Sequence, residues 1–229
     1  MPKPKKRRIH ECAYCGETKE TTRDHVIPKA LFTKPYPRDL ITVPACDACN
    51  GIRKSANDTL LRDILTTDVE GSTNPTAHKL FTEKVLDAHQ RNQSPFTRNI
   101  IKNARLQPLY TGAGVFLGDY YMLTLPSGEV ENLFEFLIRG LYYSLEKKRI
   151  PDTCQFEVKR YLAWEFKPLV EYFLQRPITR SRTLDDVFGY ACMFDPNYPC
   201  HQAWLLWFYN RVGFSVLTEE TTTAAVNTS

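Results

Sequence analysis

The sequence lacks any long hydrophobic run. No stretch approaches the ~20 consecutive apolar residues that a membrane-spanning helix needs. The basic N-terminus lacks the apolar segment that follows the charges of a secretion signal, and no internal repeat is visible. We therefore expect a soluble, cytoplasmic protein with no membrane partner.

Positive charge is concentrated in the first part of the chain. Residues 1–62 hold 13 Lys and Arg against 7 Asp and Glu, so they carry a net charge of +6. The remaining residues hold 17 against 19 and carry −2. This asymmetry indicates a polyanionic partner for the N-terminal part, although the basic residues 1–9 are equally consistent with a solvated tail.

The composition and the hydrophobic pattern predict an α+β protein. Hydrophobic residues make up 42% of the chain, which permits a packed core and excludes full disorder. Short β-compatible runs at 20–28 and 39–44 precede a helical pattern from Asp47, and turn residues at 70–75 mark a boundary. We divide the chain into a basic arm (1–9), an N-terminal module (10–71), an accessory α+β domain (72–217) and a flexible tail (218–229).

The accessory domain shows three further patterns. A hairpin is expected with its turn at Gly118 and Asp119. Residues 129–149 form the strongest predicted helix, and two late strands are expected at 187–194 and within 203–218. The helix carries one apolar stripe, formed by Phe134, Leu137, Ile138, Leu141 and Leu145.

Four of the seven cysteines form two C-x2-C pairs, Cys12 with Cys15 and Cys46 with Cys49. Two such pairs complete a tetrahedral site with zinc–sulfur distances of about 2.3 Å. Without a secretion signal, this pattern indicates a metal before disulfides. The zinc would be structural, since four protein ligands leave no open position. The spacing of Cys192, Cys200 and His201 fits no ligand pattern, so we expect ordinary packing there.

The segment between the cysteine pairs holds a candidate catalytic pair, Asp24 and His25. A carboxylate together with the amide oxygen of Asn50, which opens the following helix, suits Mg²⁺. An adjacent imidazole can deprotonate the attacking water. Because neighbouring side chains of a strand point to opposite faces, both residues can act at one site only if the strand twists or bulges there.

Several motifs follow one another in the order C-x2-C, DHVIPKALF, DLITVPAC, C-x2-C-N, KSAND. This order resembles the zinc-bearing form of the HNH endonuclease family, over about residues 10–65. The resemblance implies a ββα-metal, treble-clef-like module. It implies that His25 is the general base and that Asp24 and Asn50 are the ligands of a catalytic Mg²⁺ or Mn²⁺. It also implies a phosphate contact for Lys54, and we expect Arg53 beside it to bind phosphate as well.

The chain departs from this family at Asp39, where many relatives have the Asn that braces the catalytic imidazole. Aspartate can also accept a hydrogen bond from the ring, so we expect Asp39 to support His25, with a surface role as the alternative. Asn57 is an alternative to Asn50 as the closing residue of the motif. Asp58 is a weaker candidate ligand and is more consistent with a solvated helix residue.

These patterns predict a metal-dependent endonuclease that hydrolyses phosphodiester bonds of DNA. Its activity should fall below pH ~6.5, where an ordinary histidine is protonated. RNA is an alternative substrate, and nucleic-acid binding without cleavage is an alternative function. The resemblance also implies a role in genome defence or in a mobile element. Residues 72–217 match no motif, and we expect them to supply specificity, homodimerisation or a surface for a partner protein.

Overall fold

The structure, a computed structural model, describes residues 8–67, 74–91, 102–122, 128–161, 163–176 and 179–221. The side chains of residues 52–57, 89, 121, 122, 129, 163 and 164 are not among those described. The expected basic arm, boundary and tail fall largely outside the described residues. Ordered strands nevertheless extend into the arm, to Arg8, and into the tail, to Glu220.

The N-terminal part is a three-stranded antiparallel sheet of order β1-β2-β3, followed by two helices. A short 3-10 helix, η1 (Lys29–Leu31), lies in the connection between β2 and β3. Strands β2 and β3 overlap the two β-compatible runs of the sequence, whereas β1 was not predicted, and the first helix begins at Asp47 as expected. The elements are β1 (Arg8–Glu11), β2 (Thr18–His25), β3 (Thr42–Cys46), α1 (Asp47–Asn50) and α2 (Ile52–Thr67).

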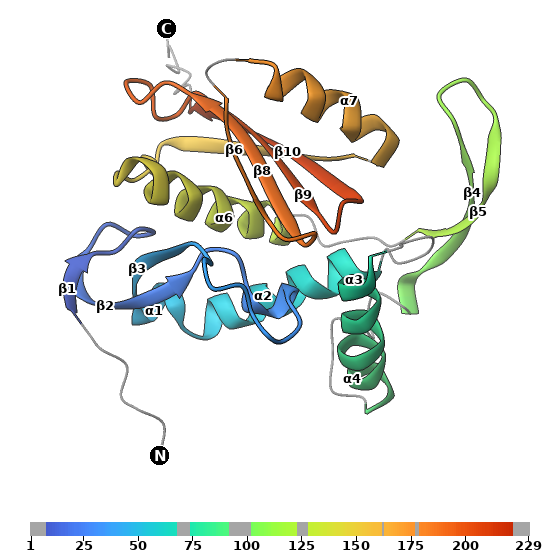
Figure 1. The fold of residues 1–229 in the computed structure, drawn as a ribbon, viewed down its shortest axis with the longest axis horizontal. Helices are drawn as coiled ribbons and strands as arrows, with labels where there is room; N and C mark the ends of the chain where they lie inside the picture. Colours follow the sequence, from blue (N-terminus) through green and yellow to red (C-terminus); the bar gives the residue numbers. More distant parts are fainter. Residues whose placement is uncertain are drawn as a thin grey trace, which may run out of the picture.

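A five-stranded antiparallel sheet of order β6-β10-β9-β8-β7 forms the second layer. Helix α6 (Glu129–Glu146) packs on one face, where the ring centroids of Phe134 and Phe214 lie 4.3 Å apart. Helix α7 (Ala163–Leu174) covers the other face (Figure 1). The strands are β6 (Cys154–Tyr161), β7 (Arg180–Leu184), β8 (Phe188–Phe194), β9 (Gln202–Phe208) and β10 (Val212–Glu220).

Helix α6 also packs against the N-terminal part, so it lies between the two sheets (Figure 1). Gly140 permits this close approach, because a Cβ atom there would lie 2.8 Å from Cγ1 of Val26 and 3.2 Å from the hydroxyl of Tyr14. The predicted apolar stripe is buried along most of its length. One hydrophobic core therefore contains residues from both sides of the expected boundary near residue 72.

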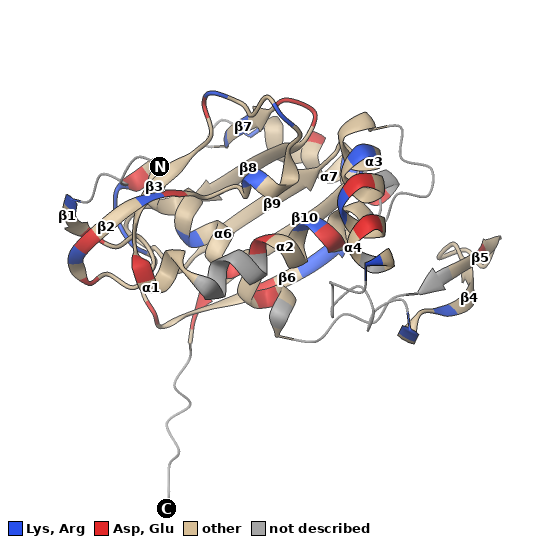
Figure 2. Cartoon of the chain, turned by 90° about the horizontal axis from the view of Figure 1, so that it is seen from below, with Lys and Arg blue, Asp and Glu red and all other residues tan. Residues whose placement is uncertain are grey.

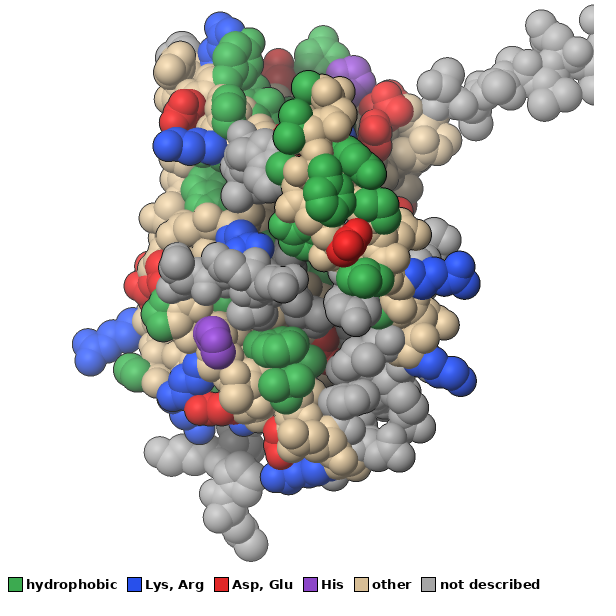
Figure 3. Space-filling model, turned by 90° about the vertical axis from the view of Figure 1, so that its right-hand side faces the viewer, with side chains coloured by type: hydrophobic (Ala, Val, Ile, Leu, Met, Phe, Trp, Pro, Cys, Tyr) green, Lys and Arg blue, Asp and Glu red, His purple; other side chains and the backbone are tan. Residues whose placement is uncertain are grey.

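Three consecutive short helical segments and a hairpin lie between the two parts in the sequence. Helix α3 (Pro75–Leu80) continues through a π-helical stretch, η2 (Phe81–Leu86), into α4 (Asp87–Gln90). The hairpin, β4 (Arg105–Tyr110) with β5 (Phe116–Met122), forms a sheet of its own. Figure 3 shows the side of the molecule that lies at the right of Figure 1, where apolar side chains are exposed. The exposed apolar residues of the hairpin are Leu106, Tyr110, Val115, Phe116, Leu117 and Tyr120.

The position of the hairpin turn differs from the prediction. Gly118 and Asp119 lie within β5, and the chain reverses at residues 111–115. Thr111 and Val115 close the turn with a backbone hydrogen bond of 2.8 Å. Gly114 adopts a φ of +80°, a conformation that costs glycine little. The turn therefore forms where glycine supplies a positive φ and Thr111 closes the loop.

The remaining cysteines lie in the C-terminal part. Cys154 and Cys200 form a disulfide, with Cα atoms 5.2 Å apart, that joins the start of β6 to the segment before β9. Ordinary packing was expected for Cys200, and this is wrong because sheet formation brings Cys154 alongside it. Cys192 is buried in β8, as expected. Among the described residues, no helix combines the length and apolar character needed to cross a membrane.

Candidate metal centre

The structure brings the four cysteines of the two C-x2-C pairs together. Cys12 and Cys15 lie in the turn between β1 and β2, Cys46 ends β3 and Cys49 lies in α1. All four sulfur atoms lie within 4.8 Å of one another, and those of Cys15 and Cys46 are 3.8 Å apart. A tetrahedral zinc–thiolate site separates neighbouring sulfurs by about 3.8 Å. The cluster can therefore hold a zinc ion, as the spacing predicts.

The protein environment affects the four thiols differently. Burial raises the pKa of Cys15 and of Cys49. Burial also acts to raise the pKa of Cys12, but hydrogen bonds from the backbone N–H groups of Cys15, Cys46 and Tyr14 outweigh it and lower that pKa to about 7. Metal binding to such a cluster displaces protons, so affinity for zinc should fall as the solution becomes acidic.

Asp24 is held by a residue of the first cysteine pair. The hydroxyl of Tyr14 donates a hydrogen bond of 2.6 Å to Oδ2 of Asp24, and both side chains are buried. Burial, followed by the charges of Asp24 and Asp58, raises the pKa of Tyr14 well above its usual range. Tyr14 therefore stays protonated and remains a donor to the carboxylate.

Asn50 reaches the same face of β2 as Asp24. Its side-chain amide donates a hydrogen bond of 2.9 Å to the hydroxyl of Thr22. Thr22 and Asp24 are two residues apart on one strand, so their side chains share a face. This contact joins the end of α1 to the strand that carries Asp24.

His25 leaves the strand on the opposite face from Asp24. Asp24 pairs with Val43 and His25 with Thr42, and the register of these two fully described strands has no shift. The bulge that would bring both side chains to one face is therefore absent from β2. His25 is, however, the last residue of β2 and is only partly buried, so it lies where the strand ends.

Asp39 contacts the second sheet. The guanidinium of Arg182 on β7 donates hydrogen bonds to the carboxylate of Asp39 (2.8 Å) and to its backbone carbonyl (2.7 Å). The Asp39 side chain is 66% exposed. The hydrogen bond from Arg182 lowers the pKa of Asp39. The described contacts of this carboxylate thus match the surface role that the sequence left open.

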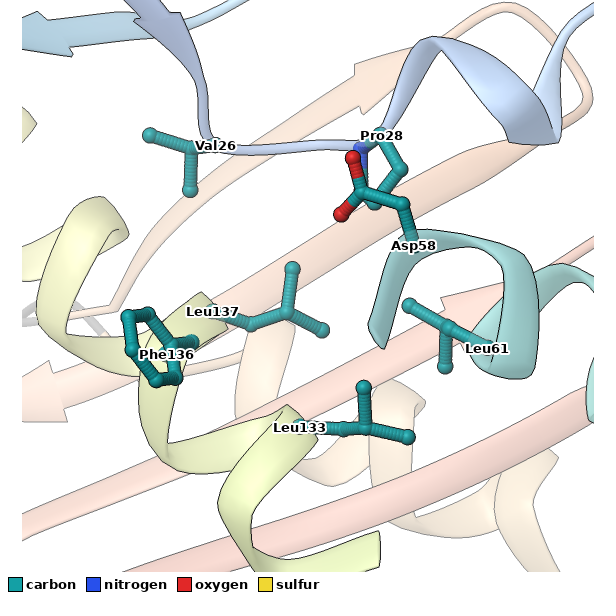
Figure 4. A pocket seen from close by; sticks show the side chains of 7 residues that line it. All are labelled: Val26, Pro28, Asp58, Leu61, Leu133, Phe136 and Leu137. Atoms are coloured by element: carbon teal, nitrogen blue, oxygen red, sulfur yellow. The ribbon is translucent and has the colours of Figure 1, made fainter. Parts of the chain in front are cut away.

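The side chains of three predicted site residues, Arg53, Lys54 and Asn57, lie outside those described, although their backbone belongs to α2. Asp58 is partly buried rather than fully solvated. It lines a cavity of about 10 Å³ between α2 and α6, with its carboxylate directed toward Pro28 (Figure 4). A cavity of this size has room for about one water molecule.

Sequence reasoning missed two residues of the centre, Tyr14 and Thr22. Tyr14 lies between the first two cysteines, where a buried aromatic residue with a polar end often finds a partner. Thr22 precedes Asp24 by two residues, which places it on the same face of a strand. Both signals were visible in the sequence, but their partners were not.

Comparisons with protein families, with curated proteins and with solved structures found no match to this chain.

Proposed function

We propose that this protein is a metal-dependent endonuclease of the HNH type, with its site at the ends of β2 and α1. The proposal rests on the hydrogen bond from Asn50 to Thr22, because this contact joins the strand of Asp24 to the helix that carries Cys49. Asp24 and Asn50 supply the hard oxygen donors that Mg²⁺ and Mn²⁺ prefer. The adjacent cysteine cluster can hold the structural zinc of such a module.

Each residue has a defined role in this proposal. Asp24 and Asn50 hold the catalytic cation, and His25 removes a proton from the attacking water. A bound divalent cation would polarise the scissile phosphate and stabilise charge on the leaving oxygen. Tyr14 orients the carboxylate of Asp24. Arg53 and Lys54, at the start of α2, bind the phosphate.

DNA is the proposed substrate, and genome defence or a mobile element is the proposed setting. The basic N-terminal part supports a polyanionic substrate. RNA offers the same phosphodiester bond, so the two substrates are separated by assay. The C-terminal part contributes specificity, self-association or a partner surface in this proposal.

The second candidate function is nucleic-acid binding without cleavage. The regular register of β2 with β3 favours it, because Asp24 and His25 point to opposite faces of the strand. Cleavage requires that the substrate phosphate reach both residues at the end of β2.

Incubation of the protein with supercoiled plasmid and with RNA, in Mg²⁺, Mn²⁺ or chelator, separates these functions. We expect His25→Ala to lower the cleavage rate by about 100-fold or more, while zinc content and nucleic-acid binding stay unchanged. His78→Ala, at an exposed position of α3, is the matched control and should cleave like the native protein. Normal cleavage by His25→Ala would overturn the assignment, and binding without any cleavage would establish the second function.

A further inference from the structure

A groove of about 650 Å³ lies along the N-terminal sheet and the end of α6. Its charged lining comes from Arg8, Arg23 and Lys147, all exposed, and none of its described lining residues is acidic. Charged residues of both signs lie on β1 and β2 as a whole (Figure 2). The charged residues that line the groove are therefore all positive, although the surrounding surface carries charges of both signs. The other lining residues are His10, Thr21, Thr22, Thr42, Val43, Pro44 and Tyr143.

Two residues that line the groove, Thr21 and Arg23, lie on the same face of β2 as His25. Arg8 pairs with Thr21 across β1 and β2. Thr21, Arg23 and His25 alternate along β2, so they share one face at intervals of about 6.6 Å. The Arg23 guanidinium donates a hydrogen bond of 3.3 Å to the hydroxyl of Thr42, which pairs with His25. Arg23 thus places a positive charge on the face of β2 that ends at His25, and Arg8 adds a second from the neighbouring strand β1.

Helix α6 supplies the wall that faces these strands. Tyr143 and Lys147 lie four residues apart, so they occupy the same side of the helix end. The Lys147 ammonium donates a hydrogen bond of 2.9 Å to the carbonyl of Ser144. An ammonium has three N–H donors, so two remain for a ligand.

We infer that this groove binds the phosphodiester backbone of a nucleic-acid strand and leads it to His25. Arginine, lysine, threonine and tyrosine side chains are the groups that bind phosphate oxygens in nucleic-acid complexes. The absence of a carboxylate among the described lining residues makes the groove complementary to a polyanion. The inference rests on the proposed function for the role of His25, whereas strand binding can be measured without cleavage.

The test compares two double variants of the full chain. The groove variant, Arg8→Gln/Arg23→Gln, removes two charges from the groove. The control variant, Lys79→Gln/Lys84→Gln, removes two exposed charges from α3 and η2, which lie at the opposite end of the molecule in Figure 1. Fluorescence anisotropy with labelled duplex DNA, single-stranded DNA and RNA, without added divalent cation, gives affinity against salt concentration. The slope of log affinity against log salt concentration reports the number of phosphate contacts. Loss of two contacts should reduce the magnitude of this slope by about 1.8 for a duplex and about 1.4 for a single strand.

We expect the groove variant to bind more weakly and with the smaller slope, and the control to match the native protein. Arg8→Lys/Arg23→Lys, which keeps both charges, should recover the native slope, and one zinc per chain in every variant verifies folding. Native affinity and slope in the groove variant, or no binding by the native protein, would overturn the inference. Weaker binding by the groove variant without cleavage by the native protein would instead refute the proposed function alone.

Discussion

The hydroxyl of Tyr14 donates a hydrogen bond of 2.6 Å to the carboxylate of Asp24, which lies on β2. Tyr14 stands between Cys12 and Cys15, so any ion bound by the four cysteines also fixes the position of the tyrosine. Gly140 of α6 leaves room for this hydroxyl. The cysteine cluster, the carboxylate and the central helix are therefore one packed unit.

Replacing Tyr14 with Phe should weaken this unit. The buried Asp24 carboxylate would lose a donor, which costs about 1–3 kcal/mol in free energy of unfolding. If Asp24 holds the catalytic cation, loss of its hydrogen-bond partner should raise the Mn²⁺ concentration for half-maximal cleavage about 10–100-fold. Urea unfolding and a Mn²⁺ titration measure the two effects.

Tyr110→Phe is the matched control, because Tyr110 is exposed on β4. It should leave both quantities at their native values, and zinc content should be the same in both variants. A Tyr14→Phe protein with native stability and native metal dependence would show that the contact does not position Asp24.

Local patterns predicted much of the fold. The C-x2-C spacing predicts four sulfurs that the structure places within 4.8 Å of one another. The apolar stripe from Phe134 to Leu145 predicts α6, which the structure begins at residue 129 as expected and ends at Glu146. These features follow from spacing within a knuckle or a helix, which tertiary contacts did not change.

Non-local contacts could not be predicted in the same way. The disulfide joins Cys154 to Cys200, 46 residues apart, and depends on the order of strands in the second sheet. The contact of Asp39 with Arg182 spans 143 residues. A sequence shows which side chains are able to pair, but the strand order of the second sheet and the packing of α6 between the two sheets determine which ones meet.

The structure predicts three chemical classes among the seven cysteines. Alkylation followed by peptide mapping should label Cys12, Cys15, Cys46 and Cys49 faster once a chelator has removed zinc. Cys154 and Cys200 should react only after reduction of the disulfide. Cys192 should stay unlabelled while the protein is folded, because burial raises its pKa to about 12 and the thiolate is the reactive form.

Metal analysis of the same sample should find one zinc per chain, and its loss should increase as the pH falls. Labelling of Cys154 in unfolded protein without reductant would contradict the disulfide. A labelling pattern that the chelator does not change would contradict the zinc site.

The ion pair of Asp39 with Arg182 should act as a surface link between β7 and the loop before β3. Arg182 lowers the pKa of Asp39 in the folded state, so the stabilisation is present above the unfolded pKa and is lost as the pH falls through the folded value. It should therefore stay constant between about pH 6 and pH 8, where both states are ionised. The exposed position makes the contribution small, because water screens the pair.

Asp39→Ala, Arg182→Ala and the double variant test this link against a role in catalysis. If the link is the main role of Asp39, all three variants should cleave at the native rate and show a small decrease in the urea midpoint. The decrease should be at least as large for Arg182→Ala as for Asp39→Ala, because only Arg182→Ala also removes the hydrogen bond to the Asp39 carbonyl. The double variant should match Arg182→Ala. If Asp39 instead braces His25, Asp39→Ala should slow cleavage while Arg182→Ala does not. The difference in rate between these two single variants therefore decides whether the carboxylate serves the imidazole or the sheet.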